Sequence, residues 1–389
     1  MPATLYDLSP AVRLLMLGAA IALLPFAWTW WRQGHEPAAR RWRAITVLTL
    51  FLTFDLVLFG AFTRLTDSGL GCPDWPGCYG STSPVGASAH IAAAETAMPT
   101  GPVTQSKAWI EMIHRYLATA LGALITATMI AGWVLRRRGR SDGPAPWWAT
   151  ATFVWVCVQG AFGAWTVTMK LFPAIVTLHL LGGYLGLALL TAQVQADAPR
   201  RAALPPRLRR VAWALFGLIV LQSALGGWVS TNYAVLACST FPSCQGSWWP
   251  AMNFADGFTI WRDLGMRPDG SLLPFDALTA IHYVHRLAAY AVLAAMVGFA
   301  GVLIRRSDTT HRPFGWAVAA LAAWQLATGL SNVVLDWPLV AALAHTGGAG
   351  AAIVVLTALL VRTRVTSATS KLIDSSLARS LDPGYSLMR

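Results

Sequence analysis

Histidine is the residue type in this chain whose placement points most directly to chemistry. Of the eight histidines, five lie inside or at the edge of long apolar segments: His114, His179, His282, His285 and His345. An ionisable side chain is costly in a membrane-spanning segment and usually has a function there. Imidazole can ligate haem iron, or it can form a hydrogen bond between helices.

An internal repeat pairs four of these histidines. Spacings of 12, 6 and 20 residues occur twice, in Gly60–Cys72, Cys72–Cys78 and Gln159–His179, and again in Gly226–Cys238, Cys238–Cys244 and Gln325–His345. Two four-helix units are therefore joined in tandem. Each unit has an even number of spans, so we predict that the units share an orientation and are related by a pseudo-two-fold axis along the membrane normal.

The repeat gives each unit two histidines at matching positions. His114 and His285, each followed by arginine, begin the second helix of a unit, and His179 and His345 begin the fourth. Each is expected about 10 to 13 Å inside its helix, at about 1.5 Å per residue. Two imidazoles at equal depth in a four-helix unit can ligate one iron from both sides. The symmetry favours two bis-histidine haem sites over four unrelated hydrogen bonds.

The solvent for most of the chain is predicted to be lipid. Hydrophobic residues make up 56% of the 389 residues and charged residues only 12%, with a mean hydropathy of +0.52, which excludes a soluble globular domain. The positive charges follow the first apolar segment, which favours a retained helix over a signal peptide. Nine segments are long enough to span a bilayer: 11–31, 44–63, 108–135, 146–168, 172–195, 208–230, 277–304, 314–335 and 338–361.

The net charge of +12 indicates topology rather than nucleic-acid binding, because the basic residues cluster in alternate short connections. The clusters lie at 136–140, 200–210, 305–312 and 362–371, whereas the long loops 64–107 and 231–276 are mixed or acidic. We predict a multi-pass protein of the bacterial inner membrane, with the N-terminus external and the C-terminus cytoplasmic. The two external loops should be irregular, with short helices.

The cysteines agree with this topology. Four of the five form two pairs in the external loops, Cys72 with Cys78 and Cys238 with Cys244. Such a pair can hold a metal, but an oxidising compartment and the lack of a nearby histidine favour disulfides. Cys157, alone within a span, is predicted to be a buried apolar residue.

The predicted fold is an all-α polytopic membrane protein, with two tandem four-helix bundles and one extra N-terminal transmembrane helix. The extra helix and a basic loop occupy 1–43, the two units occupy 44–199 and 200–365, and a cytoplasmic tail occupies 366–389. Gln159 and Gln325 are expected to form interhelical hydrogen bonds, with a haem-pocket role as the alternative. The role of Arg64 stays open: it can determine topology or anchor the loop.

Several motifs resemble those of the haem A synthase family: TRLTDSGLGCPDWPGCYG at 63–80, EMIHRYLA at 111–118, HLLGG at 179–183, HYVHRLAAY at 282–290 and HTGG at 345–348. The resemblance covers about residues 44–362. It implies that the C8 methyl group of haem O, supplied by haem O synthase, is oxidised to a formyl group by successive hydroxylations. The product would be haem A for cytochrome oxidase.

The resemblance also implies different roles for the two units. His285 and His345 would ligate a haem b cofactor, while His114 and His179 would hold the haem O or haem A being processed. In the family the Cys72–Cys78 pair has been considered redox-active, and a structural disulfide is the alternative.

Glu111 is the predicted catalytic residue. It lies three residues before His114 on the same helical face, where the other unit has His282. A carboxylate in this place can move protons during oxidation of a methyl group, or it can serve as a structural partner of Arg115. Arg115 and Arg286 are candidates for binding haem propionates, with snorkelling to the membrane interface as the alternative.

Two other classes of protein fit part of this pattern. A diheme cytochrome that only transfers electrons across the bilayer would place its haems near opposite faces, whereas both predicted sites lie at the external side. A transporter would carry ionisable groups near the bilayer midplane, whereas the charges and histidines here are predicted to lie near one edge. The sequence names no electron donor and leaves homo-oligomer formation open.

Overall fold

The computed structural model describes residues 9–196, 202–306 and 310–365. Within these ranges nine helices are long and apolar enough to cross a membrane, so the nine predicted spans are confirmed. The largest shift is at α2, which begins at Ala38 rather than at 44. The spanning helices are α1 (Ser9–Arg32), α2 (Ala38–Leu65), α4 (Gln105–Arg137), α5 (Pro146–Thr168), α6 (Pro173–Ala196), α7 (Pro206–Thr231), α9 (Phe275–Ile304), α10 (Arg312–Val334) and α11 (Leu339–Arg362). The predicted tail 366–389, and Arg200 and Arg201 of the second basic cluster, lie outside the described residues.

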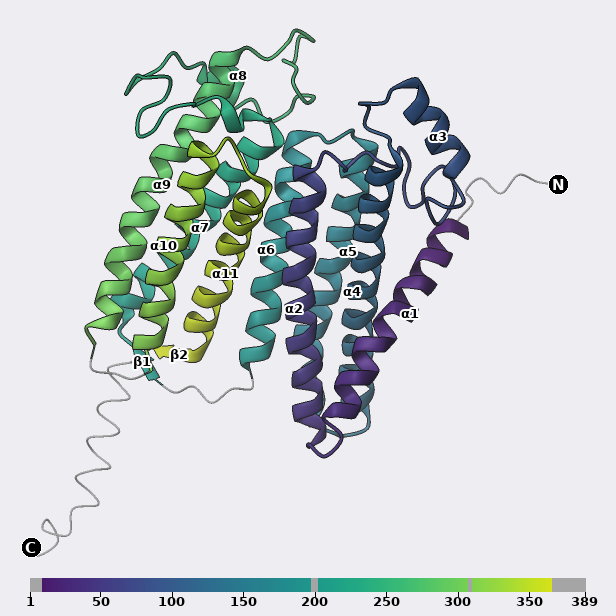
Figure 1. Cartoon of the computed structure of the whole chain (residues 1–389). Coiled ribbons are helices and arrows are strands. Elements are labelled where there is room, and N and C mark those ends of the chain that lie inside the picture. Colours follow the sequence, from purple (N-terminus) through teal and green to yellow (C-terminus); the bar gives the residue numbers. More distant parts are fainter. Residues whose placement is uncertain (1–8, 197–201, 307–309, 366–389) are drawn as a thin grey trace, which may run out of the picture.

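The two long loops lie at the same end of the bundle, which we call the loop face (Figure 1). They contain only short helical pieces, as predicted: α3 (Ser88–Ala97), the 3-10 helix η1 (Ala234–Leu236) and α8 (Phe254–Gly257). At the opposite face two three-residue strands, β1 (Ala202–Leu204) and β2 (Thr363–Val365), pair in parallel. The helical class is therefore correct, and this small ribbon is an addition to it.

Local sequence signals account for the ends and the interiors of several helices. Pro146 and Pro206 stand in the first turns of α5 and α7, where a missing amide proton costs no hydrogen bond. The Thr104 hydroxyl accepts a hydrogen bond from the Lys107 amide and caps α4. In α2, threonine hydroxyls such as Thr49 donate to the carbonyl four residues earlier, which satisfies them inside an apolar segment.

The spanning helices pack in two groups, and α1 stands outside them. We call α2, α4, α5 and α6 the N-terminal half, and α7, α9, α10 and α11 the C-terminal half; neighbouring helices pack together within each half (Figure 1). The halves meet where α6 packs on α7 and α11, and where α2 packs on α11. Leu187, Leu215, Phe299 and Leu356 are buried in one core that crosses this boundary. The pseudo-two-fold relation between the halves stays a prediction.

The backbone repeats as well as the sequence. In the turn between α5 and α6, Lys170 and Leu171 have φ of 50° and 59°, and in the turn between α10 and α11, Asp336 and Trp337 have φ of 51° and 62°. Left-handed backbone is uncommon for residues other than glycine. Its recurrence at matching positions indicates that both halves turn back toward the membrane in the same way.

Side-chain hydrogen bonds join the two halves at the loop face. At the loop face, Arg64 donates a hydrogen bond of 2.5 Å to the Ser230 carbonyl oxygen, and the Tyr233 hydroxyl donates one of 2.7 Å to Asp67. At the opposite face, β1 leads into α7 and β2 follows α11, so their pairing joins two helices of the C-terminal half. The role left open for Arg64 is therefore that of an anchor between the halves.

The prediction for Cys157 was wrong, because this residue is exposed. It lies on α5, of which little is buried within the protein. An apolar side chain in a membrane span has no need of a protein core, since lipid is an equally apolar environment.

Candidate functional site

All five membrane histidines lie near the loop face. His114, His179, His285 and His345 follow the first residues of α4, α6, α9 and α11 by 9, 6, 10 and 6 positions. At about 1.5 Å per residue, they lie about 9 to 15 Å inside their helices. The rings of His114 and His179 are close enough to interact electrostatically, and so are those of His285 and His345. The structure therefore brings the histidines together in the predicted pairs.

Each of the four imidazole rings faces a glycine on a neighbouring helix. A Cβ atom on that glycine would lie within 3.0 to 3.5 Å of the ring, close enough in three of the four cases to crowd it. The four pairs are Gly60 with His114, Gly163 with His179, Gly226 with His285, and Gly329 with His345. The glycines themselves match in the repeat. The absence of a side chain at these positions lets each ring pack closely against the neighbouring helix.

This arrangement fits a haem in each half. A bis-histidine haem needs two imidazoles that face each other across an apolar slot wide enough for a flat ring system. Phe59 stacks nearly parallel to His114, with the ring centroids 6.2 Å apart. The Nδ1 atom of His179 is buried without a hydrogen-bond partner among the described residues. The donor set, the glycines beside the rings and the unpartnered ring nitrogen all suit ligation of a haem iron.

The imidazoles of the C-terminal half have fixed hydrogen bonds. The Thr328 hydroxyl donates to the Trp324 carbonyl oxygen at 2.7 Å, so its oxygen can only accept from His345, whose Nδ1 lies 3.0 Å away. The proton is therefore on Nδ1, and Nε2 is free to ligate a metal. The Gln222 amide nitrogen lies 3.0 Å from Nδ1 of His285 and donates to the carbonyl oxygen of His285 at 3.0 Å, so this ring too is held from its Nδ1 side.

The N-terminal half has no such partners. In the repeat, Leu56 stands where the C-terminal half has Gln222, and Phe162 stands where it has Thr328. Neither side chain can form a hydrogen bond. Within the described ranges, no hydrogen bond reaches the ring of His114 or of His179. The two halves therefore share a pair of histidines beside glycines and differ in the residues that contact the imidazole rings.

The first loop is tied to α4 by a buried ion pair. Glu111 accepts a hydrogen bond from the Cys72 amide at 2.7 Å through one carboxylate oxygen, and its other oxygen pairs with Arg115. Arg115 also donates to the carbonyl oxygens of Asp74, Pro76 and Gly77. The loop is thereby held on the helix that carries His114.

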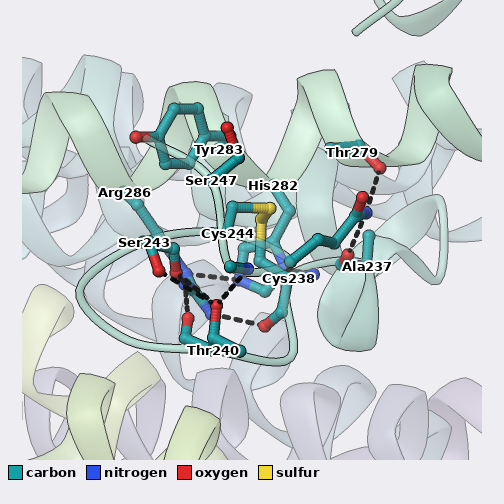
Figure 2. Close-up of a disulfide and its surroundings, with 12 residues drawn as sticks. Ala237, Cys238, Thr240, Ser243, Cys244, Ser247, Thr279, His282, Tyr283 and Arg286 are labelled. Atoms are coloured by element: carbon teal, nitrogen blue, oxygen red, sulfur yellow. Dashed lines mark hydrogen bonds between the residues drawn. A yellow bond between two sulfur atoms is a disulfide. The ribbon is translucent and has the colours of Figure 1, made fainter. Parts of the chain in front are cut away.

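The second loop is tied to α9 in the same way, with a neutral residue in place of the carboxylate. The ring of His282 lies between the Cys238 amide, 3.3 Å from Nδ1, and the Arg286 guanidinium, 3.2 Å from Nε2, and as a neutral imidazole it accepts a hydrogen bond from one of them at a time. Arg286 also donates to the carbonyl oxygens of Cys238 and Thr240, both at 2.6 Å (Figure 2). Glu111 and His282 therefore have equivalent structural positions.

Both predicted disulfides are present. The Cα atoms of Cys72 and Cys78 are 4.9 Å apart, and those of Cys238 and Cys244 are 4.6 Å apart, with both sulfur pairs bonded. These separations lie within the range of protein disulfides. Both cysteine pairs are therefore disulfides in the structure and not metal sites.

The other predicted residues have mixed outcomes. Gln325 donates an interhelical hydrogen bond to the His345 carbonyl oxygen at 3.1 Å, as expected. Gln159 packs against Gly182 of the next helix. The catalytic role of Glu111 and the binding of propionates by Arg115 and Arg286 stay predictions, since the contacts of all three are with the loops.

Sequence reasoning missed several residues near the sites. An alignment of the two halves would have identified them. Gly163 and Gly329 match in it, whereas Gln222 and Thr328 differ from their counterparts in the N-terminal half. Asp55 was also missed. It lies ten residues before the end of α2 and is exposed, so the prediction that all charges lie near one edge of the membrane was wrong.

Comparisons with known proteins agree with the resemblance in the motifs. A family model described as cytochrome oxidase assembly protein, COX15-CtaA, matches residues 43–360. A haem A synthase of Shewanella oneidensis is 37% identical over 308 residues, which cover 78% of this chain and 90% of that protein. Haem A synthases of Allorhizobium ampelinum and a Methylobacterium strain are each 30% identical, over 81% and 85% of this chain and 87% and 94% of those proteins.

Proposed function

The chain belongs to the cytochrome oxidase assembly protein family that includes the haem A synthases, and on this basis we propose that it oxidises the C8 methyl group of haem O to a formyl group. It is a multi-pass protein of the inner membrane. The substrate would come from haem O synthase, and the product would serve cytochrome oxidase. The basic connections support an external loop face, an external N-terminus and a cytoplasmic C-terminus.

We assign His285 and His345 as the ligands of a haem b cofactor. A haem iron at this site would supply one-electron chemistry to the reaction. Thr328 and Gln222 fix the rotation of the two rings and keep Nε2 turned to the metal. Hydrogen-bonded ligands of this kind suit a group that stays bound.

We assign His114 and His179 as the ligands of the substrate haem. The absence of fixed partners for these rings suits a group that must enter and leave. Glu111 would take up and release protons at its carboxylate, which Arg115 and the Cys72 amide hold in place. Arg115 and Arg286 stand at the rim of each site as candidates for contact with propionates.

The observation that carries this proposal is the pair of matched histidine sites, of which only one has hydrogen-bonded ligands. The test is pigment analysis of the purified protein. We expect one haem b per chain together with haem O or haem A, and conversion of added haem O to haem A in membranes that contain the protein. Haem b alone, at two per chain and with no conversion, would instead indicate a diheme cytochrome.

A further inference from the structure

A groove of about 700 Å³ lies between the two halves, on the membrane-facing side of the helices. Its walls come from α2, α10 and α11 and include Phe54, Leu58, Phe62, Trp324 and Ala351. This volume lies in the range of small-molecule sites, about 300 to 1,000 Å³. The lining is almost entirely apolar, so its occupant must be largely hydrocarbon.

Asp55 is the one charged residue in the lining of the groove. It lies ten residues before Leu65, the last residue of α2, and therefore about 15 Å from the loop-face end of the helix. That depth is close to the middle of a bilayer about 30 Å thick. No hydrogen bond or ion pair to Asp55 occurs within the described parts of the chain. A carboxyl group at this depth needs a polar partner, which the groove must receive from outside the protein.

The groove is continuous with the predicted substrate site. Phe59 forms part of its wall and stacks on the ring of His114. Asp55 precedes Phe59 by one helical turn, so both side chains lie on the same side of α2. An occupant of the groove would therefore reach the edge of a haem held by His114.

We propose that this groove binds the hydroxyethylfarnesyl chain of haem O, with the isoprenoid carbons against the apolar walls and the hydroxyl group hydrogen-bonded to Asp55. The proposal rests on the proposed function, because it names the part of the substrate that the site recognises. The chain is apolar along its length and carries one hydroxyl next to the porphyrin, which matches one carboxyl group in an apolar groove beside the iron ligand. A phospholipid acyl chain would leave Asp55 without a partner.

The repeat supports a role specific to the substrate half. The position in α7 that matches Asp55 is Leu221, an exposed apolar residue such as is common on the lipid-facing side of a membrane helix. A carboxyl group is therefore present only in the half assigned to haem O. The cofactor haem b has no farnesyl chain and needs no such group.

The test compares two haems that differ in the tail. Haem O and haem B are titrated separately into the full-length purified protein that carries its cofactor, and binding is followed by the bis-histidine absorption spectrum. Asp55→Leu introduces the residue found at the matching position, and Ala351→Phe fills the groove six residues beyond His345. Leu185→Phe, at the exposed position that matches Ala351, is the control. Asp55→Asn keeps a partner for the hydroxyl group.

We expect Asp55→Leu and Ala351→Phe each to weaken binding of haem O about tenfold or more, while haem B binds as in the unaltered protein. Asp55→Asn should restore most of the affinity, and Leu185→Phe should change neither haem. Equal effects on both haems, or no effect on haem O, would overturn the groove assignment. A change in the mass of the detergent-solubilised particle in Asp55→Leu would also overturn it, because the groove would then be a contact between copies. If neither haem binds to the unaltered protein, the proposed function itself fails.

Discussion

The two histidine sites are built on the same frame and differ in a few residues. Both have two imidazoles near the loop face, glycines beside the rings and a disulfide loop tied to the helix of the first ligand. In the C-terminal half Thr328 and Gln222 contact the rings of His345 and His285, whereas Phe162 and Leu56 occupy these positions in the N-terminal half. The comparison teaches that duplication repeats the histidine geometry, while the residues around the rings have diverged. Under the proposed function, these residues would decide whether the bound group stays or exchanges.

Removal of one ligand from each half should give the largest effect. We expect His345→Ala to lose haem b completely, because one remaining imidazole does not hold the cofactor against detergent extraction. His179→Ala should keep haem b and produce no haem A. Chromatography of extracted haem, normalised to protein, measures both. Haem b that survives in His345→Ala, or is lost in His179→Ala, would remove the distinction between the halves.

The exchange of Glu111 for glutamine tests whether the acidic residue of the N-terminal half has a role beyond holding the loop. Glutamine can still accept from the Cys72 amide, but it cannot carry a proton. Conversion of haem O should fall about 10² to 10⁴-fold, the usual contribution of a positioned acid or base. Binding of haem O should not change. His282→Gln is the matched control, and conversion within a few-fold of the unaltered protein is expected. If Glu111→Gln converts haem O at the same rate, the residue is only a loop anchor.

Arg115 and Arg286, which hold the two loops on their helices, should differ in their contribution to stability. Arg115→Ala leaves the Glu111 carboxylate buried without its cation, which costs about 3 to 5 kcal/mol of folding free energy. Arg286→Ala leaves only the neutral His282 and unpaired carbonyl groups, at a cost of about 1 to 3 kcal/mol. Thermal unfolding in detergent, followed by the loss of helical circular dichroism, compares the two. Equal losses would show that the Glu111–Arg115 pair contributes nothing specific.

The smallest effects should come from the residues behind the ligands. Thr328→Val keeps the shape of the side chain and removes the hydrogen-bond acceptor for His345. The dissociation rate of haem b should therefore rise about 10 to 100-fold. Its reduction potential should rise, because a less electron-rich imidazole stabilises ferric iron less well. Phe162→Thr provides the missing acceptor for His179 and should slow release of haem A. Transfer of haem to an acceptor protein and potentiometric titration measure these changes, and an unchanged potential in Thr328→Val would contradict the role of the hydroxyl group.

The sequence alone predicted the spans, both disulfides and the pairing of four histidines near the loop face, because each depends on a local rule of length or spacing. The role of these histidines as haem ligands stays a prediction. It could not predict the partners of the ligands. A threonine in an apolar helix usually bonds to its own backbone, and Thr328 does so while it also reaches His345. Its second contact depends on how α10 and α11 are rotated, which no local pattern encodes.

The contacts of Glu111 show the same limit. Its nearness to Arg115 was predictable from helical spacing, but the bond to Cys72 joins residues 39 positions apart through an irregular loop. Cys157 failed for a different reason, since an apolar segment can face either lipid or protein. Asp55 was overlooked because a single acidic residue in a long span does not alter its hydropathy enough to be noticed.

The contact between the halves has a consequence for the rate at which electrons would move between haems bound in them. Tunnelling weakens steeply as the gap between donor and acceptor widens. Arg64 and Tyr233 join the halves at the loop face, near both histidine pairs, and α6 packs on α7 and α11. The gap between the two histidine pairs is thus set by helix packing and hydrogen bonds, and electron exchange between haems held there would require no hinge motion.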